Sequence, residues 1–246
     1  MEPDYSRLYH RSSQSHAKGH PAYSNDPKEW PEEWLTTYYK TYPRFERIPL
    51  DVMRPEAADF FTLVSERKSR RDFTKEAISL RDLSILLKFA CGTTTPLGDG
   101  TFRRAHPSAG GRFPLEVYPI ALRDEGDMRA GLYHYNVQEH SLETLWARAF
   151  YDGEVDQLFS YDWVKKASVV FIMTSVFART QNKYGERGYR YIILEAGHIA
   201  QNVYLIAEAL GIKCTALVGT RDEKLEKLLD IDGVGESVVY AVALGR

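Results

Sequence analysis

The sequence predicts an α+β fold with a mixed central sheet flanked by helices. Five short runs rich in β-branched and aromatic residues are bounded by turn residues, at 115–122, 131–137, 169–176, 213–218 and 238–244. Two longer runs with helical periodicity lie between the later strands. The composition changes near residue 50, which predicts an N-terminal arm (1–50) followed by one domain (51–246).

The N-terminal arm is polar and rich in aromatic residues. Prolines interrupt it at five positions, namely Pro21, Pro27, Pro31, Pro43 and Pro49. Proline removes a backbone donor and fixes φ, so regular structure is disfavoured there. We expect this extended arm to wrap around the domain or a neighbouring subunit rather than to form a core.

The helices of the domain follow in order. A proline near the start of 55–65 predicts a helix there. Ser79 and Asp82 have the spacing of an N-terminal cap, and the apolar run behind them ends at Gly92. The residues 93–100 are expected to form a loop, which lacks the G-K-[ST] of a nucleotide-hydrolysing phosphate loop. A long helix over 189–210 should end at Gly211, and a shorter one should cover 222–230.

Composition narrows the class of function. The 246 residues, 43% of them hydrophobic, suffice for one large core. A net charge of −2 gives no electrostatic case for binding nucleic acid or an anionic membrane. No apolar run reaches the length of a membrane span and the N-terminus lacks a hydrophobic signal core, which predicts a cytoplasmic protein.

Neither cysteines nor histidines suggest a metal site. Cys91 and Cys214 form no C-x-x-C motif and are expected to be small buried apolar residues. His10, His16 and His20 follow no helical period. We therefore predict no metal.

The run Arg104–Tyr118 (RAHPSAGGRFPLEVY) is the most informative segment. Pro107 and Pro114 fix a turn, Ser108 offers a hydroxyl, and Gly110 with Gly111 lets backbone amides approach a ligand closely. Arg104 and Arg112 add donors suited to phosphate or carboxylate. The plainer alternative is a surface turn that opens a strand.

A second basic segment precedes this turn. Arg67, Ser69 and Arg71 alternate, so that an extended chain presents all three to one side. Such a set suits a phosphate and a ribityl chain, and the alternative is a solvated basic run.

Together the two segments resemble the nitroreductase-like flavoprotein superfamily, whose members carry R-x-S-x-R/K followed by P-S-x-G. The longer R-x-x-P-S-A-G-G-x-x-P-L-E-V-Y is similar to the SagB-type branch, which includes FMN-dependent azoline oxidases of thiazole and oxazole peptide biosynthesis. The resemblance implies a nitroreductase-like fold with FMN as cofactor. The implied FMN-binding residues are Arg67, Ser69, Arg71, Arg104, Pro107, Ser108, Ala109, Gly110, Gly219 and Arg246.

The same resemblance implies that Lys183 and Tyr184 are catalytic. A lysine or tyrosine ordinarily titrates near 10, so acting as a base at neutral pH needs a shift of roughly three units. Burial lowers the pKa of a lysine, whereas neighbouring positive charge lowers that of a tyrosine. The neighbouring Arg187 and Arg190 predict a lowered pKa for Tyr184. Whether Lys183 or Tyr184 is the base stays open. The leader matches only at Tyr9-His10.

Three polar residues of the long helix lie on one stripe. Glu195, His198 and Asn202 are spaced i, i+3 and i+7, and the resemblance places them near substrate or behind the residues that contact it. For His198 the alternative is a core histidine that is hydrogen-bonded to a neighbouring carboxylate or carbonyl.

The function predicted from this resemblance is oxidation of thiazolines or oxazolines to azoles in a peptide. It implies a homodimer with FMN between the subunits and a cyclodehydratase partner. Two other hypotheses remain, a nitro- or quinone-type reductase that uses NAD(P)H and a non-catalytic scaffold in a peptide-modifying complex. The electron acceptor, oxygen or nicotinamide, stays open.

Overall fold

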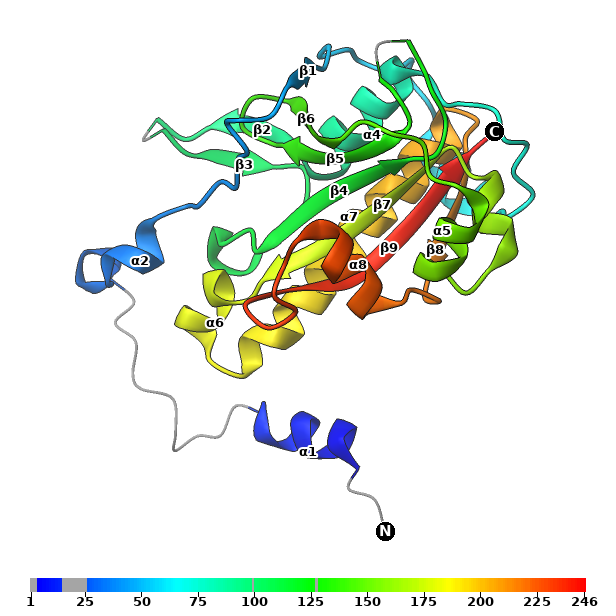
Figure 1. Ribbon diagram of the computed structural model, residues 1–246. Helices are drawn as coiled ribbons and strands as arrows, with labels where there is room; N and C mark the ends of the chain where they lie inside the picture. The colour runs from blue at the N-terminus through cyan, green and yellow to red at the C-terminus, as the bar shows by residue number, and fades with distance from the viewer. Residues whose placement is uncertain (1–3, 15–25, 99, 127) are drawn as a thin grey trace.

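The computed structural model describes residues 4–14, 26–98, 100–126 and 128–246. A seven-stranded sheet with the order β1-β6-β5-β4-β7-β9-β8 forms its centre (Figure 1). Its strands are β1 Arg47–Pro49, β4 Leu115–Ala121, β5 Gly131–Asn136, β6 Ser141–Trp146, β7 Val169–Val176, β8 Lys213–Leu217 and β9 Glu236–Gly245. A separate hairpin pairs β2 Thr93–Pro96 with β3 Phe102–Arg104.

The predicted α+β class is confirmed, with two corrections to detail. Each strand pair of the main sheet that the structure describes is antiparallel, so the sheet is not mixed. The reason is the connectivity, since β4, β5 and β6 follow one another as a meander and β8 turns back through a short helix onto β9. The segment predicted as a loop after Gly92 contains β2, because Thr93 pairs with Arg104.

The helices cover the sheet and one another. They are α1 Tyr5–Ser12, α2 Glu32–Leu35, α3 Phe60–Glu66, α4 Leu80–Cys91, α5 Asp152–Leu158, α6 Ala178–Tyr184, α7 Arg187–Ala209 and α8 Asp222–Leu229. Short 3₁₀ turns are η1 Pro27–Glu29, η2 Ala109–Gly111 and η3 Asp162–Lys166.

Helix ends follow local capping chemistry. The Ser79 hydroxyl accepts from the Asp82 amide at 3.0 Å, and α4 ends at Gly92, both as predicted. The helix expected from Pro55 is shorter and begins at Phe60, because the Asp59 carboxylate caps it by accepting from the Thr62 amide at 2.8 Å.

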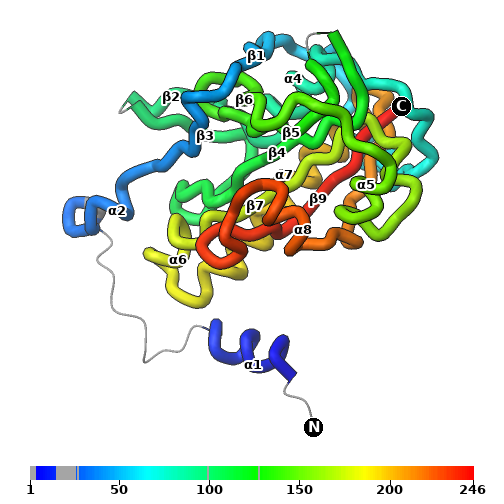
Figure 2. The backbone as a smooth tube through the Cα atoms, in the orientation of Figure 1, coloured from blue at the N-terminus to red at the C-terminus, as the bar shows by residue number. Residues whose placement is uncertain are grey.

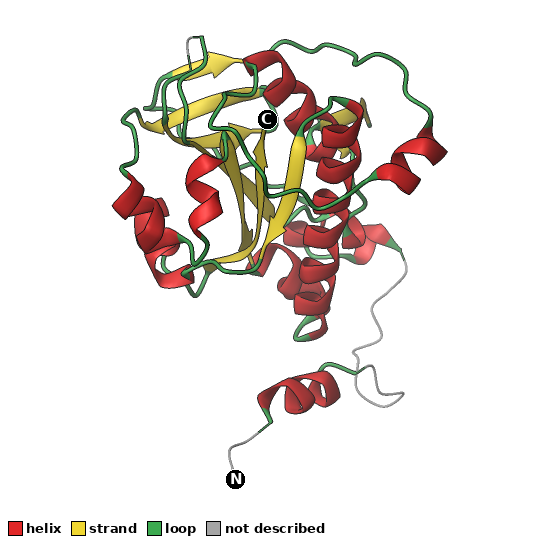
Figure 3. Ribbon diagram, turned by 90° about the vertical axis from the view of Figure 1, so that its right-hand side faces the viewer, coloured by secondary structure: helices red, strands yellow, loops and turns green. Residues whose placement is uncertain are grey.

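The sheet is buried on both faces, as Figure 3 shows with helices on either side. Along β7, Val169, Phe171 and Met173 pack against α4 and α7. The alternate residues Val170 and Ile172 pack on the other face with α5 and α8. This alternation follows from the two-residue repeat of a strand. Cys91 and Cys214 are buried and free, as expected.

The arm lies against the domain at several points (Figure 2). The Lys40 ammonium pairs with Glu236 at 2.5 Å, and the Tyr42 amide donates to Glu143 at 2.9 Å. The chain then enters the sheet as its edge strand β1, and Leu50 joins the core. His16, His20 and Pro21 lie outside the described residues.

The helices of the described residues are short or carry charged side chains along their length. Among them, no helix combines the length and apolarity that a bilayer span requires.

Candidate functional site

The glycine turn meets the predicted catalytic pair. The Ser108 hydroxyl accepts from the Phe113 amide at 2.9 Å and closes the turn. Gly110 and Gly111 adopt φ values of 61° and 65°, which favour glycine. A Cβ on Gly110 would lie 2.5 Å from the Tyr184 hydroxyl oxygen. The structure thus brings together the turn predicted to bind FMN and the helix α6 that carries Lys183 and Tyr184.

A pair of glycine variants tests this contact. Both Gly110→Ala and Gly111→Ala place a side chain at positive φ, which costs about 1 kcal/mol or more of unfolding free energy. Only Gly110→Ala also collides with Tyr184, since nothing lies within 4 Å of a Cβ on Gly111. We expect thermal unfolding to show a larger loss for Gly110→Ala, and equal losses would contradict the contact.

Lys183 is enclosed by aromatic rings. It is 7% exposed, and its Nζ lies 3.4 Å from the ring centroid of Trp30, 5.6 Å from that of Trp34 and 5.7 Å from that of Tyr184. Burial, aided by the charge of Arg112, lowers the pKa of Lys183. This is the direction that the sequence predicted for a lysine base.

Tyr184 shows the opposite shift. Burial and the neighbouring Tyr191 raise its pKa, while the charge of Arg112 opposes them. The expectation that Arg187 and Arg190 lower this pKa is wrong. The Arg187 Nε donates to the Tyr191 hydroxyl at 2.9 Å and the Arg190 Nε donates to the Ser13 hydroxyl at 2.8 Å, so their charges face the arm and Tyr191.

Arg112 anchors the arm. Its Nε donates to the Arg179 carbonyl at 3.0 Å, and its Nη1 and Nη2 donate to the carbonyls of Trp34 and Glu33. The Arg112 donors that the sequence offered for phosphate or carboxylate are therefore bound to backbone oxygens.

Arg104 and His106 lie beneath the turn. Arg104 is 9% exposed, and its guanidinium stacks over the Phe113 ring at 4.5 Å and the Tyr39 ring at 5.5 Å. Burial lowers its pKa. Pro107 and Gly110 are exposed above it, and Ser108 and Ala109 are half-buried, so these four form the accessible part of the turn.

Two of the three polar residues on α7 hold the turn in place. Glu195 is buried and pairs with His106 Nε2 at 3.1 Å. Burial outweighs the carboxylate and lowers the pKa of His106. The Asn202 amide donates to the Ala90 carbonyl of α4 at 3.1 Å and to the Ala105 carbonyl, two residues before Pro107, at 3.5 Å. His198 is exposed, so the core-histidine interpretation is wrong.

The remaining predicted residues gather around aromatic rings. The Ser69 and Tyr204 hydroxyls lie 3.0 Å apart, and the Arg67 guanidinium lies over the Tyr204 ring at 5.1 Å. Arg71 lies over Trp163 at 6.0 Å. Trp163 stacks on Tyr161, against which Gly219 packs so closely that a Cβ would lie 2.5 Å from its ring.

The predicted residues therefore fall into several groups, two of which contact the same helix. Tyr204 lies on α7 with Glu195 and Asn202, so one helix supports both the turn and the Arg67–Ser69 pair. The Arg246 guanidinium instead pairs with Asp82 at 2.6 Å, at the start of α4. Only tertiary contacts bring several aromatic and histidine side chains to the site, so the sequence did not assign them roles. They are Trp30, Trp34, Tyr204, Trp163 and His106.

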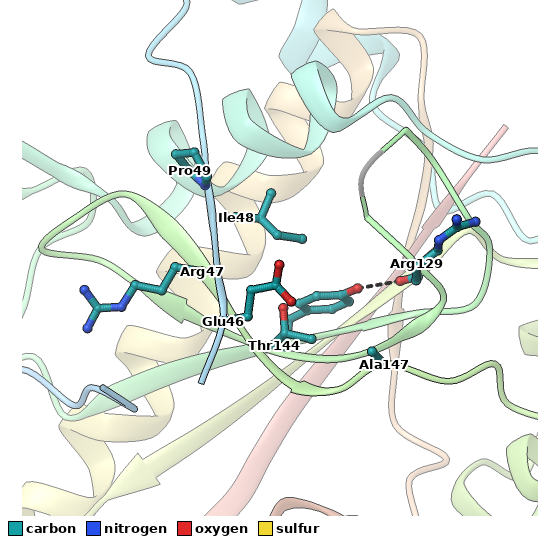
Figure 4. Close-up of a pocket in the computed structure, with 8 residues that line it drawn as sticks. Glu46, Arg47, Ile48, Pro49, Arg129, Thr144 and Ala147 are labelled. Atoms are coloured by element: carbon teal, nitrogen blue, oxygen red, sulfur yellow. Dashed lines mark hydrogen bonds between the residues drawn. The ribbon is translucent and has the colours of Figure 1, made fainter. Parts of the chain in front are cut away.

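Two pockets lie in the described structure near the arm. Figure 4 shows one between β1 and the β5–β6 hairpin, where the Tyr133 hydroxyl donates to the Arg129 carbonyl at 2.6 Å. Its lining residues are Glu46, Arg47, Ile48, Pro49, Arg129, Tyr133, Thr144 and Ala147. None of these was predicted to bind FMN or act in catalysis. The other adjoins the site, since Arg112, Arg179 and Asn182 line it.

The family is established by sequence comparison. Residues 64–246 match the model described as "Nitroreductase family", and the chain belongs to that family. A Methanocaldococcus jannaschii protein named as a nitroreductase is 34% identical over 171 residues, covering 68% of this chain and 81% of its own.

The relatives also confirm the resemblance to the SagB-type branch. The microcin B17-processing protein McbC of Escherichia coli is 28% identical over 168 residues, covering 64% of this chain. The trifolitoxin-processing protein TfxB of Rhizobium leguminosarum is 29% identical over 177 residues, covering 69% of this chain. The alignments span 58% and 48% of these two relatives' lengths.

Solved structures confirm the nitroreductase-like fold. A nitroreductase homologue from Anabaena variabilis superposes with a TM-score of 0.75 at 25% identity, covering 97% of this chain and 45% of that one. The E. coli microcin synthetase McbBCD complex, with truncated pro-MccB17 bound, contains a chain with a TM-score of 0.61 at 20% identity, covering 98% and 91%. A Desulfovibrio desulfuricans nitroreductase homologue with this fold was solved in complex with FMN (TM-score 0.52, 18% identity, covering 75% and 84%).

Proposed function

We propose that this protein is an FMN-dependent dehydrogenase that oxidises azoline rings in a peptide to azoles. The observation that carries the proposal is the position of Lys183, a buried lysine with a lowered pKa, beside Tyr184 and the glycine turn. The similarity to McbC and TfxB, both peptide-processing proteins, supports the peptide substrate.

FMN is the cofactor, and the exposed residues fit it. Pro107 to Gly110 present a turn without a bulky side chain, beside which backbone amides approach a flat ring. Ser69 and Arg71 are exposed and Arg67 is half-buried, which leaves a hydroxyl and two guanidinium groups for the ribityl chain and phosphate. Arg104 does not face the cofactor in this arrangement; its guanidinium packs over the Phe113 ring and supports it.

The chemistry divides between cofactor and protein. FMN, when bound, accepts the hydride that leaves one ring carbon of the azoline. Lys183 Nζ takes the proton from the adjacent atom, so the ring loses two hydrogens and becomes an azole. A lowered pKa leaves a larger neutral fraction of Lys183 at neutral pH. The raised pKa of Tyr184 keeps its hydroxyl protonated, which suits it to donate a hydrogen bond to the substrate.

We also propose that the protein is a homodimer that acts with a cyclodehydratase. Helix α7 exposes Ile193 (41%) and Leu194 (61%), and α3 exposes Phe60 (59%) and Phe61 (79%). Large exposed apolar side chains of this kind suit an interface between two copies. The E. coli McbBCD complex, which was solved with truncated pro-MccB17 bound, supports a partner enzyme. The cytoplasmic location expected from the sequence stays a prediction.

The first experiment is the absorbance spectrum of the purified protein, followed by release and identification of the flavin. We expect bound FMN and oxidation of an azoline-bearing peptide with oxygen as acceptor. Rapid NAD(P)H oxidation without azoline turnover would indicate a nitro- or quinone-type reductase instead. Absence of flavin after reconstitution would contradict the proposal and favour a scaffold role.

A further inference from the structure

The N-terminal arm covers the predicted catalytic lysine. The match to the nitroreductase family begins at residue 64, so the arm lies outside it. Yet Trp30 of the arm lies nearest to the Lys183 ammonium of the three rings around it, with its ring centroid 3.4 Å from Nζ. Trp30 and Trp34 pack edge to face, with ring centroids 6.3 Å apart, and Trp34 adds a more distant ring at 5.6 Å from Nζ.

Backbone and ionic contacts hold the arm in this position. Arg112 donates to the carbonyls of Glu33 and Trp34, three and four residues after Trp30 in the chain. Further along, Lys40 pairs with Glu236 at the start of β9. The arm is therefore fastened to the glycine turn and to the sheet, independently of the contact between Trp30 and Lys183.

We infer that Trp30 is a positioning residue for Lys183, whose ring fixes the ammonium beside Tyr184 and stabilises its protonated form. This inference rests on the proposed function for the role of Lys183. The face of an indole attracts a cation, and this attraction strengthens when water is excluded. Among the described residues, Arg112 of the turn and Tyr184 of α6 are the charged and titratable groups that act on Nζ, so the ring face of Trp30 opposes the repulsion from Arg112.

Two opposing contributions therefore set how much of Lys183 is protonated. Burial and Arg112 favour the neutral amine, while the indole favours the ammonium. Removing the ring while keeping an apolar side chain should shift the balance toward the amine. The neutral amine is the form that reacts with acylating reagents, so acetylation reports the balance directly.

Competitive acetylation of the flavin-loaded full chain tests this inference. Acetic anhydride is applied over a range of alkaline pH values, and mass spectrometry gives the rate at each lysine. The midpoint of the pH dependence reports the pKa, and the plateau reports access to the reagent. Trp30→Leu removes the ring, Trp30→Phe keeps one, and Lys40 in the same samples reports whether the arm stays docked.

We expect Trp30→Leu to lower the midpoint for Lys183, so that acetylation below the midpoint is about three- to tenfold faster than in the wild type. Trp30→Phe should stay within about twofold of the wild type. Lys40 should react equally in all three proteins.

Two results would overturn the inference. One is an equal midpoint for Lys183 in the wild type and both variants. The other is a parallel increase at Lys40, because release of the arm would then account for the change. The measurement needs no substrate, so it is independent of azoline oxidation. If Trp30→Leu behaves as expected but Lys183 variants keep full turnover, the proposed function fails and the Trp30 contact stands.

Discussion

Replacing Lys183 by methionine should reduce turnover of an azoline peptide by about 10²- to 10⁴-fold, the usual contribution of a positioned general base. Methionine keeps an unbranched apolar side chain between Trp30 and Tyr184, so the fold and the bound FMN should be retained. Steady-state kcat and the flavin content of the same preparation measure the two effects. In the wild type, kcat should rise with pH and level off below the ordinary lysine pKa of 10.5, because the pKa of Lys183 is lowered.

Lys88→Met is the matched control for this variant. Lys88 also has a pKa lowered by burial, but it lies on α4 and donates to the Thr93 hydroxyl at 3.1 Å. We expect this variant to turn over at the wild-type rate. Tyr184→Phe should lose less activity than Lys183→Met, since the phenol stays protonated. Wild-type turnover in a flavin-loaded Lys183→Met protein would refute the assignment of the base.

Much of the sheet was predictable because its strands are buried on both faces. The apolar run Val169–Met173 predicted a strand over Val169–Val176, as observed. Strand β6 was missed because Glu143, a residue that ordinarily stays in water, lies in its middle and is fully buried. Its burial depends on His134 and Asn136 of the neighbouring strand, which no local pattern reveals.

The site was predictable where backbone conformation defines it. Two consecutive glycines indicated a turn with accessible backbone amides, and both residues adopt positive φ, a conformation that favours glycine. The surroundings of Lys183 and Tyr184 were not predictable in the same way. Trp30 reaches Lys183 only through the fold, and Arg187 turns away from Tyr184 toward Tyr191 although it lies three residues along the chain.

A buried ionic network connects the sheet to the helix that carries Lys183. Glu116 of β4 and Glu143 of β6 flank His134 of β5, at 3.1 and 2.8 Å from its ring nitrogens. The second oxygen of Glu116 accepts from Arg179 of α6 at 2.6 Å. Burial alone would raise the pKa of Glu116, but His134 and Arg179 lower it to about 2. Burial likewise opposes the charge on His134, yet the two carboxylates raise its pKa.

Glu116→Gln should therefore destabilise the protein strongly. It leaves two cations, His134 and Arg179, without the carboxylate between them. Breaking a buried pair in this way costs about 3–5 kcal/mol, which lowers Tm by about 6–20 °C in a protein of this size. Glu139→Gln is the matched control, because Glu139 is half exposed and pairs with Arg47 at the sheet edge. There we expect a change in Tm within about 2 °C.

The loss in Glu116→Gln should also depend on pH, in a direction fixed by the two shifts. The lowered pKa of Glu116 means that its contribution is complete above about 4.5, its ordinary value, and is lost as pH falls toward about 2. The raised pKa of His134 means that its contribution is complete below 6.5 and is lost as pH rises through the raised value. The difference in Tm between wild type and variant should be largest between these limits and shrink on either side. A difference that does not vary with pH, or one no larger than that of Glu139→Gln, would show that the network does not secure α6 to the sheet by charge.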